Sequence, residues 1–140
     1  MEISIYVAIA ALIIAMISAG VALHACRIAT RMSQYNYLAN KWYDIKEKEF
    51  DYPDFRDPSK TCSYETVFAG DMLTRYDSFA WICWAHAEDI YSNGFHKEAA
   101  FKPTIKWYKE LHYNWLMNPD NYKRFRTMPG FIEYVNELEV

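Results

Sequence analysis

The sequence predicts an all-α protein in which one N-terminal transmembrane helix continues into a small bundle of four or five helices. Three observations predict this fold. No Asp, Glu, Lys or Arg occurs from Ile3 to Cys26. Beyond this apolar run (residues 3–26), apolar residues recur in steps of three and four, which is the period of an amphipathic helix. Only 4 Gly are present, and the 5 Pro fall at the starts of predicted segments, where proline does not interrupt a helix.

The apolar run is long enough to act as a membrane anchor, which we predict for residues 1–26. As a helix it would be about 36 Å long, which exceeds the thickness of the hydrocarbon core. A cleaved signal peptide would need a positive stretch before a shorter apolar region. The only charged residue before the run is Glu2, so the pattern favours an uncleaved anchor in the lipid bilayer.

Basic residues predict the orientation of the anchor. None precedes the apolar run, whereas Arg27 and Arg31 follow it closely. The positive-inside rule then places the N-terminus outside and residues 27–140 in the cytoplasm. The 3 Cys, which form no Cys-x-x-Cys pair, suit a reducing compartment.

Small residues within the apolar run offer a contact for a second helix. Ala15 and Ala19 are four apart and Gly20 is adjacent, which is the spacing that lets two membrane helices approach closely. The alternative interpretation is the ordinary alanine content of a spanning helix.

The region after the anchor divides at its prolines and glycines. We expect a helical extension of the anchor over 27–50 and a loop over 51–60, where Pro53 and Pro58 disfavour helix. A long amphipathic helix is expected over 61–92, with Gly94 as its left-handed cap. Short helices led by Pro103, Pro119 and Pro129 should fill 95–140.

One cluster on the long helix could support chemistry. His86 and Asp89 are three residues apart, and so are Cys83 and His86, so each pair shares a helix face. A carboxylate that orients an imidazole, or a thiolate beside one, would serve a catalyst. These residues, with Trp81 and Trp84, define an alternative function as a membrane-bound enzyme or ligand sensor. The competing interpretation is ordinary packing of an apolar helix face.

Other common chemistries lack their motifs. The sequence contains no His-Glu-x-x-His, no paired Glu-x-x-His elements and no glycine-rich phosphate loop. We therefore predict no metal site and no cofactor. The net charge of -3 argues against a generally basic nucleic-acid binder, so no nucleic-acid partner is expected.

Aromatic residues are unusually frequent, at 18% of the chain. In a small domain they can build either the core or an interface, because Trp and Tyr dominate interface hot spots. The interface candidates after the anchor are Trp42, Tyr43, Trp107, Tyr108, Tyr113 and Trp115.

Charge is also unevenly distributed. Residues 44–89 contain 11 acidic and 5 basic side chains, and residues 97–126 contain 7 basic and 3 acidic. The two segments could complement each other within one domain, between copies, or against anionic lipid. Together the observations favour a non-catalytic, single-pass accessory or scaffold subunit that binds other subunits of a membrane complex or copies of itself.

Overall fold

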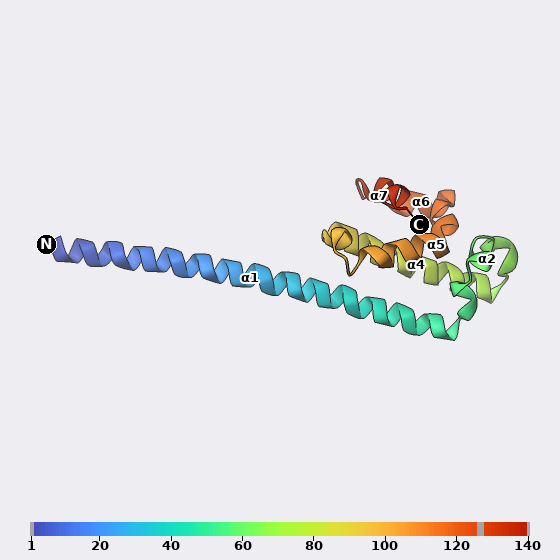
Figure 1. The fold of residues 1–140 in the computed structure, drawn as a ribbon, viewed down its shortest axis with the longest axis horizontal. Helices are drawn as coiled ribbons and strands as arrows, with labels where there is room; N and C mark the ends of the chain where they lie inside the picture. Colours follow the sequence, from blue (N-terminus) through green and yellow to red (C-terminus); the bar gives the residue numbers. More distant parts are fainter. Residues whose placement is uncertain (1, 126–127, 140) are drawn as a thin grey trace. The chain divides into compact units, whose positions relative to one another are not determined.

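The computed structural model describes residues 2–125 and 128–139, and within these ranges it contains helices and no β-strand (Figure 1). The chain forms two compact units, Met1–Tyr37 and Leu38–Val140. We call the second unit the helical domain. Helix α1 (Glu2–Asp51) begins in the first unit and ends in the helical domain. The predicted all-α fold class, with a long apolar N-terminal helix followed by a helical domain, is confirmed.

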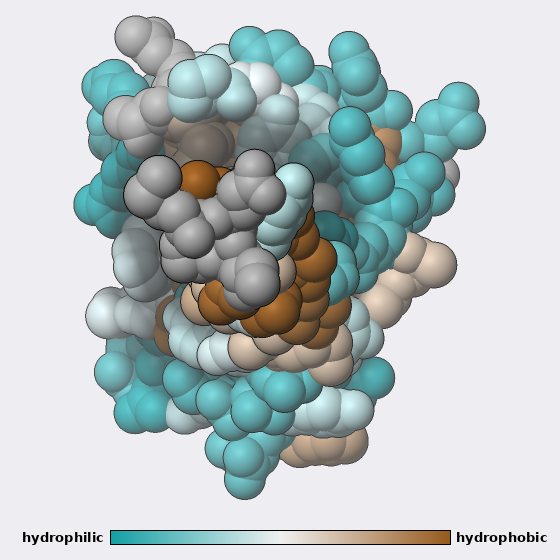
Figure 2. Space-filling model, turned by 90° about the vertical axis from the view of Figure 1, so that its left-hand side faces the viewer, coloured by the Kyte–Doolittle hydropathy of each residue, from teal (hydrophilic) through white to brown (hydrophobic). Residues whose placement is uncertain are grey.

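The first unit consists of the first part of α1. It holds one segment that is long and apolar enough to cross a membrane, and none of its most apolar window is buried within the protein. Large side chains of this segment, such as Leu12 and Ile14, are 61% and 65% exposed. In Figure 2, which looks along the molecule from its N-terminal side, strongly hydrophobic side chains gather on this part of α1.

The helical extension over 27–50 forms as the continuation of α1 to Asp51. Its apolar stripe becomes buried only from Leu38 onward, where Leu38, Ile45 and Glu49 point into the domain and are at most 1% exposed. Ile28 and Met32, which begin the same stripe, are 52% and 55% exposed. The compact domain therefore begins at Leu38, later than the residue 27 at which the sequence predicts it to begin.

The predicted loop over 51–60 is instead built from two short helical turns. These are η1 (Pro53–Arg56) and α2 (Pro58–Thr61). The Asp57 carboxylate accepts a hydrogen bond of 2.9 Å from the Ser59 amide, and Pro58 occupies the first helical position. Proline disfavours helix in the residue before it but is well tolerated in the first turn of a helix. Pro53 and Pro58 therefore begin short helices where the sequence predicted a loop.

The predicted long helix over 61–92 is interrupted near its beginning. A single turn, α3 (Tyr64–Val67), is separated from α4 (Asp71–Ser92) by Gly70, whose φ of 57° and ψ of -128° are not helical. From Tyr76 to Ile90 the predicted apolar face is buried, whereas Met72 is 39% exposed. Gly94 follows α4 with φ 75° and ψ 11°, the left-handed conformation expected of it.

The rest of the domain contains η2 (Phe95–Lys97), α5 (Lys102–Met117), α6 (Pro119–Phe125) and α7 (Phe131–Glu137). These elements occupy the stretch for which the sequence predicts short helices led by proline. The two one-turn helices α2 and α3 raise the number of α-helices after α1 above the predicted count. Helix α2 lies mostly in the segment predicted as a loop, and α3 lies in the segment predicted as the start of one continuous helix.

Aromatic rings build much of the core between α4 and α5. Trp84 and Trp115 are at most 2% exposed. The Trp84 indole nitrogen donates to the His112 carbonyl at 3.1 Å. His112 has φ -126° and ψ 16°, which makes a kink in α5. The buried indole nitrogen of Trp84 thus finds its acceptor at the kink.

Candidate functional site

His86 is a structural residue at the place where α1, α4 and α5 pack together. We call this contact of His86 with Leu38 and Tyr108 the histidine seam. His86 is fully buried. One ring nitrogen, Nε2, lies 2.9 Å from the Leu38 carbonyl oxygen, and the other, Nδ1, lies 2.8 Å from the Tyr108 hydroxyl. Because a carbonyl can only accept, Nε2 donates to Leu38 and the Tyr108 hydroxyl donates to Nδ1 in the neutral ring. Burial lowers the pKa of His86 to about 4.

The other predicted members of the α4 cluster have different partners. The Asp89 carboxylate accepts from the Lys41 ammonium at 2.9 Å, so it does not orient His86. Cys83 is fully buried, and burial raises the pKa of its thiol. With both His86 nitrogens occupied, the imidazole has no free position from which to deprotonate Cys83. The cluster is therefore not arranged for the predicted acid-base or nucleophilic chemistry.

The alternative pocket around these residues is not assembled either. Trp84 and His86 lie in the core, whereas Trp81 is 45% exposed and lines a separate cavity of about 510 Å³ between α4, α5 and α6. The four residues thus divide between the core and the surface.

The predicted interface aromatics also divide. Tyr108 and Trp115 are buried in the core and cannot contact a partner. Trp42 and Trp107 pack edge to face at 5.7 Å, and the Lys46 ammonium lies 3.4 Å from the Trp107 ring centroid. The remaining two are Tyr113, which donates to Asn136, and Tyr43.

Tyr43 is 69% exposed and is available to a partner. Within the apolar run, Ala15, Ala19 and Gly20 are exposed as well, and a Cβ added at Gly20 would meet nothing within 4 Å. These residues keep the surface that a helix-helix contact would need.

A buried charged group lies beside the histidine seam. Glu49 is 1% exposed, and its Oε2 accepts from Lys46 at 2.9 Å. Burial raises the Glu49 pKa, and the neighbouring Lys46 and Arg56 act against that rise. Glu49 Oε1 and His112 Nε2 are buried atoms without a hydrogen-bond partner in the described part of the chain. Both are polar atoms within a core that is largely apolar.

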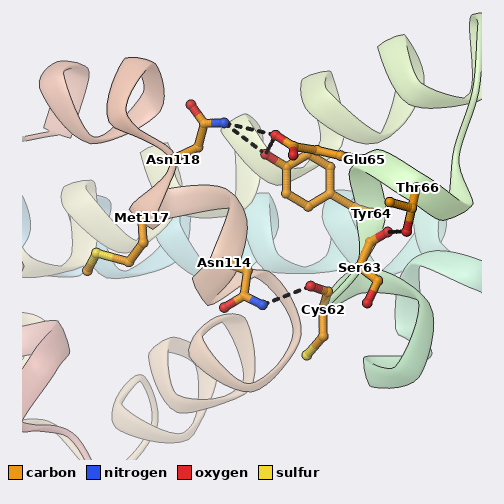
Figure 3. Close-up of a pocket in the computed structure, with 8 residues that line it drawn as sticks. All are labelled: Cys62, Ser63, Tyr64, Glu65, Thr66, Asn114, Met117 and Asn118. Atoms are coloured by element: carbon orange, nitrogen blue, oxygen red, sulfur yellow. Dashed lines mark hydrogen bonds between the residues drawn. The ribbon is translucent and has the colours of Figure 1, made fainter.

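A polar cavity of the domain lies between α3 and the end of α5. It has a volume of about 400 Å³, which is within the range of small-ligand sites. Figure 3 shows the eight residues that line it. They are Cys62, Ser63, Tyr64, Glu65, Thr66, Asn114, Met117 and Asn118.

The wall of this cavity is fixed by hydrogen bonds between the two helices. The Asn114 side-chain amide donates to the Cys62 carbonyl at 2.8 Å. Asn118 Nδ2 donates to Glu65 Oε1 at 3.0 Å, and the Tyr64 hydroxyl donates to the same oxygen at 3.1 Å. The carboxylate is therefore held in one orientation by two donors from different elements (Figure 3).

Sequence reasoning missed this cavity because one of its walls, residues 62–66, falls in a segment predicted as one continuous helix. A usable signal was present at the end of α5, where Asn114 lies in the last turn and Asn118 follows as the C-cap residue. The partner residues could not be found from the sequence, because Cys62 and Glu65 lie 52 and 53 positions from the amides that bond to them.

Metal-ligating side chains do not converge in residues 2–125 and 128–139, where no group of three or more His, Cys, Asp or Glu could hold an ion. A comparison of the chain with protein-family models, curated proteins and solved structures finds no match.

Proposed function

We propose that this chain is a membrane-anchored helical protein that acts by assembly, as an accessory or scaffold subunit rather than a catalyst. The observation that carries the proposal is the apolar run, whose side chains from Ile5 onward are exposed on a helix that continues without a break into the folded domain. Exposed apolar surface of this size needs lipid or another protein to cover it.

The chemistry of the helical domain supports the non-catalytic part of the proposal. His86, Cys83 and Asp89 are engaged in packing or in structural bonds. We place the apolar run in the bilayer, with the N-terminus outside and the helical domain in the cytoplasm, because Arg27 and Arg31 follow the run. The partners are other subunits of a membrane complex or further copies of this chain.

The native mass of the protein after gentle detergent extraction tests the assembly role. We expect a mass well above that of one 16.6 kDa chain plus its detergent. Replacing both small residues, Ala15→Leu and Ala19→Leu, should reduce that mass if this helix face makes the contact. Ala10→Leu, on the opposite side of the helix, is the matched control. A monomer in the unmodified protein would contradict the proposal.

A further inference from the structure

Helix α4 runs back along the last part of α1, towards the residue at which the chain enters the helical domain. His86, near the end of α4, bonds to the carbonyl of Leu38. Arg75, near the start of α4, donates to the hydroxyl of Tyr52, which follows α1. The two helices are therefore antiparallel within the domain (Figure 1). We call the end that holds Leu38 the Leu38 end, and the opposite end, which holds η1, α2 and α3, the distal end.

The segment 93–106 belongs to the Leu38 end. The His96 ring in η2 stacks on Tyr91 at the end of α4, with ring centroids 4.5 Å apart. From there α5 leads away to the distal end, where Asn114 donates to the Cys62 carbonyl at 2.8 Å. The element η2 and the first turn of α5 thus lie on the side of the domain at which α1 enters.

The two ends differ in charge. Residues 38–43 and 88–106, which belong to the Leu38 end, contain 4 basic and 3 acidic side chains, whereas residues 44–77, which lead to and form the distal end, contain 5 basic and 9 acidic. The stretch 27–37, which joins the apolar run to the Leu38 end, adds 2 basic side chains and no acidic one. Positive charge therefore gathers where the chain enters the domain, and negative charge gathers at the distal end.

Three lysines of the Leu38 end are available to an anionic ligand. Lys97 and Lys102 are exposed, and Lys106 is half-buried one turn further along α5. None of these three forms a hydrogen bond or an ion pair with another residue in 2–125 and 128–139. Among the acidic side chains of this end, Asp89 pairs with Lys41. The three lysines are therefore not neutralised by bonds within the domain.

Chain length keeps these lysines close to the bilayer if the apolar run crosses it. Leu38 follows Cys26 by twelve positions, all within α1, which as a helix span about 18 Å. Anionic headgroups attract lysine within roughly a Debye length, about 8 Å at physiological ionic strength. The same surface repels the acidic distal end, so the charges of both ends favour one orientation of the domain.

We propose that the Leu38 end binds the headgroups of anionic lipids, with Lys97 and Lys102 as its main contacts and Lys106 beside them. The contact holds the helical domain against the membrane surface and turns the acidic distal end away from it. This inference rests on the proposed membrane anchor, because the apolar run is what brings the domain to the bilayer.

The test compares full-length chains in lipid nanodiscs of phosphatidylcholine alone and of an equal mixture of phosphatidylcholine and phosphatidylserine. Each disc also contains a lipid with a nitroxide headgroup, which quenches a nearby fluorophore. The fluorophore is attached at position 99 of a Cys26→Ser, Cys62→Ser, Ala99→Cys chain, since Ala99 is exposed and Cys83 is buried. We expect about twofold or more quenching in the mixed discs relative to the neutral discs, and loss of this excess at high salt.

Variants and a second label position locate the contact. Lys97→Gln with Lys102→Gln should remove at least half of the excess quenching, whereas Lys123→Gln, an exposed lysine on α6, should keep it. The same fluorophore on Cys62 at the distal end, in a Cys26→Ser chain, should show no excess. An excess that persists in the Lys97, Lys102 double variant, or that is equal at Cys62, would overturn the proposal.

The same discs separate this proposal from the anchor on which it rests. A chain that enters the discs but is quenched equally in both lipids contradicts the headgroup contact and leaves the anchor intact. A chain that enters neither kind of disc contradicts the anchor and the headgroup contact together.

Discussion

At the scale of single residues, the two buried histidines of the domain are held neutral for structural reasons. His86 links the Leu38 carbonyl of α1 to the Tyr108 hydroxyl of α5, and His112 bonds to the Tyr76 hydroxyl at 3.1 Å. The hydrogen-bond partners of both rings are hydroxyl and carbonyl groups, and burial outweighs the weaker pull of Asp89 towards a charged His86. Each therefore contributes to stability only while it stays unprotonated.

Replacing His86 with Ala should destabilise the domain by about 2–4 kcal/mol, because it leaves the Leu38 carbonyl and the Tyr108 hydroxyl buried and unpaired. Denaturant unfolding in detergent, followed by the near-ultraviolet circular dichroism of the tryptophans, measures the change. His24→Ala, at an exposed position in the apolar run, is the control and should leave the free energy of unfolding unchanged. A stable His86→Ala domain would show that the seam does not need this residue.

Stability should fall as the pH is lowered below 6.5. Burial lowers the pKa from 6.5 to about 4 for His86 and to about 3 for His112. Below pH 6.5 the unfolded chain takes up these protons while the folded chain does not, so each histidine costs up to about 1.4 kcal/mol per pH unit. Above pH 6.5 both states are neutral and the effect vanishes.

The melting temperature between pH 7.5 and 5.5 measures this dependence. The raised pKa of Glu49 acts in the opposite direction, because the folded state then holds its proton more tightly than the unfolded state. The effect of Glu49 on stability therefore appears as the pH rises through and above 4.5, the ordinary pKa of a glutamate. The His86→Gln, His112→Gln double variant should show a flatter profile, and an unchanged slope would rule out the two histidines as its source.

At the scale of elements, Gly70 decides where α4 begins. Its φ of 57° and ψ of -128° suit the first central position of a type II′ turn, which favours glycine. This conformation separates α3 from α4 and so allows Tyr64 and Glu65 to face α5. The cavity therefore depends on a backbone conformation that helical periodicity does not reveal.

Gly70→Ala should destabilise the domain by about 1–3 kcal/mol through backbone strain alone. A Cβ at this position meets no atom within 4 Å, so a steric clash does not contribute. Gly20→Ala in α1 has equally open space and a helical backbone, and it should cause no loss. The free energies of unfolding of both variants check the difference, and equal effects would contradict the role of the turn.

The contrast between α4 and α3 shows how far the sequence could predict this fold. The apolar period correctly indicated the buried face of α4, where Tyr76, Phe79 and Ile90 are at most 4% exposed. The same apolar period wrongly predicted that the helix continues through Gly70, because a local pattern does not reveal a single residue with positive φ. The hydrogen bond from Asn118 to Glu65 joins residues 53 positions apart, so no local pattern could predict it.

At the scale of the whole molecule, one helix belongs to two environments. Its first part has no buried side chain among residues 5–34, and its last part buries Leu38, Ile45 and Glu49 in the domain. The apolar run ends at Cys26 while the domain begins at Leu38. If the run crosses a membrane, the positive charges that follow it determine which side the domain occupies.

The accessibility of Cys62 tests this orientation. Cys62 is exposed in the helical domain, whereas Cys83 is buried. In a Cys26→Ser, Cys83→Ser variant, a membrane-impermeant maleimide should label Cys62 only after the cells are permeabilised. A variant that lacks all three native cysteines and carries Glu2→Cys should be labelled in intact cells. Labelling of Cys62 in intact cells would place the domain outside and reverse the proposed orientation, whereas recovery of the protein in the soluble fraction would remove the anchor itself.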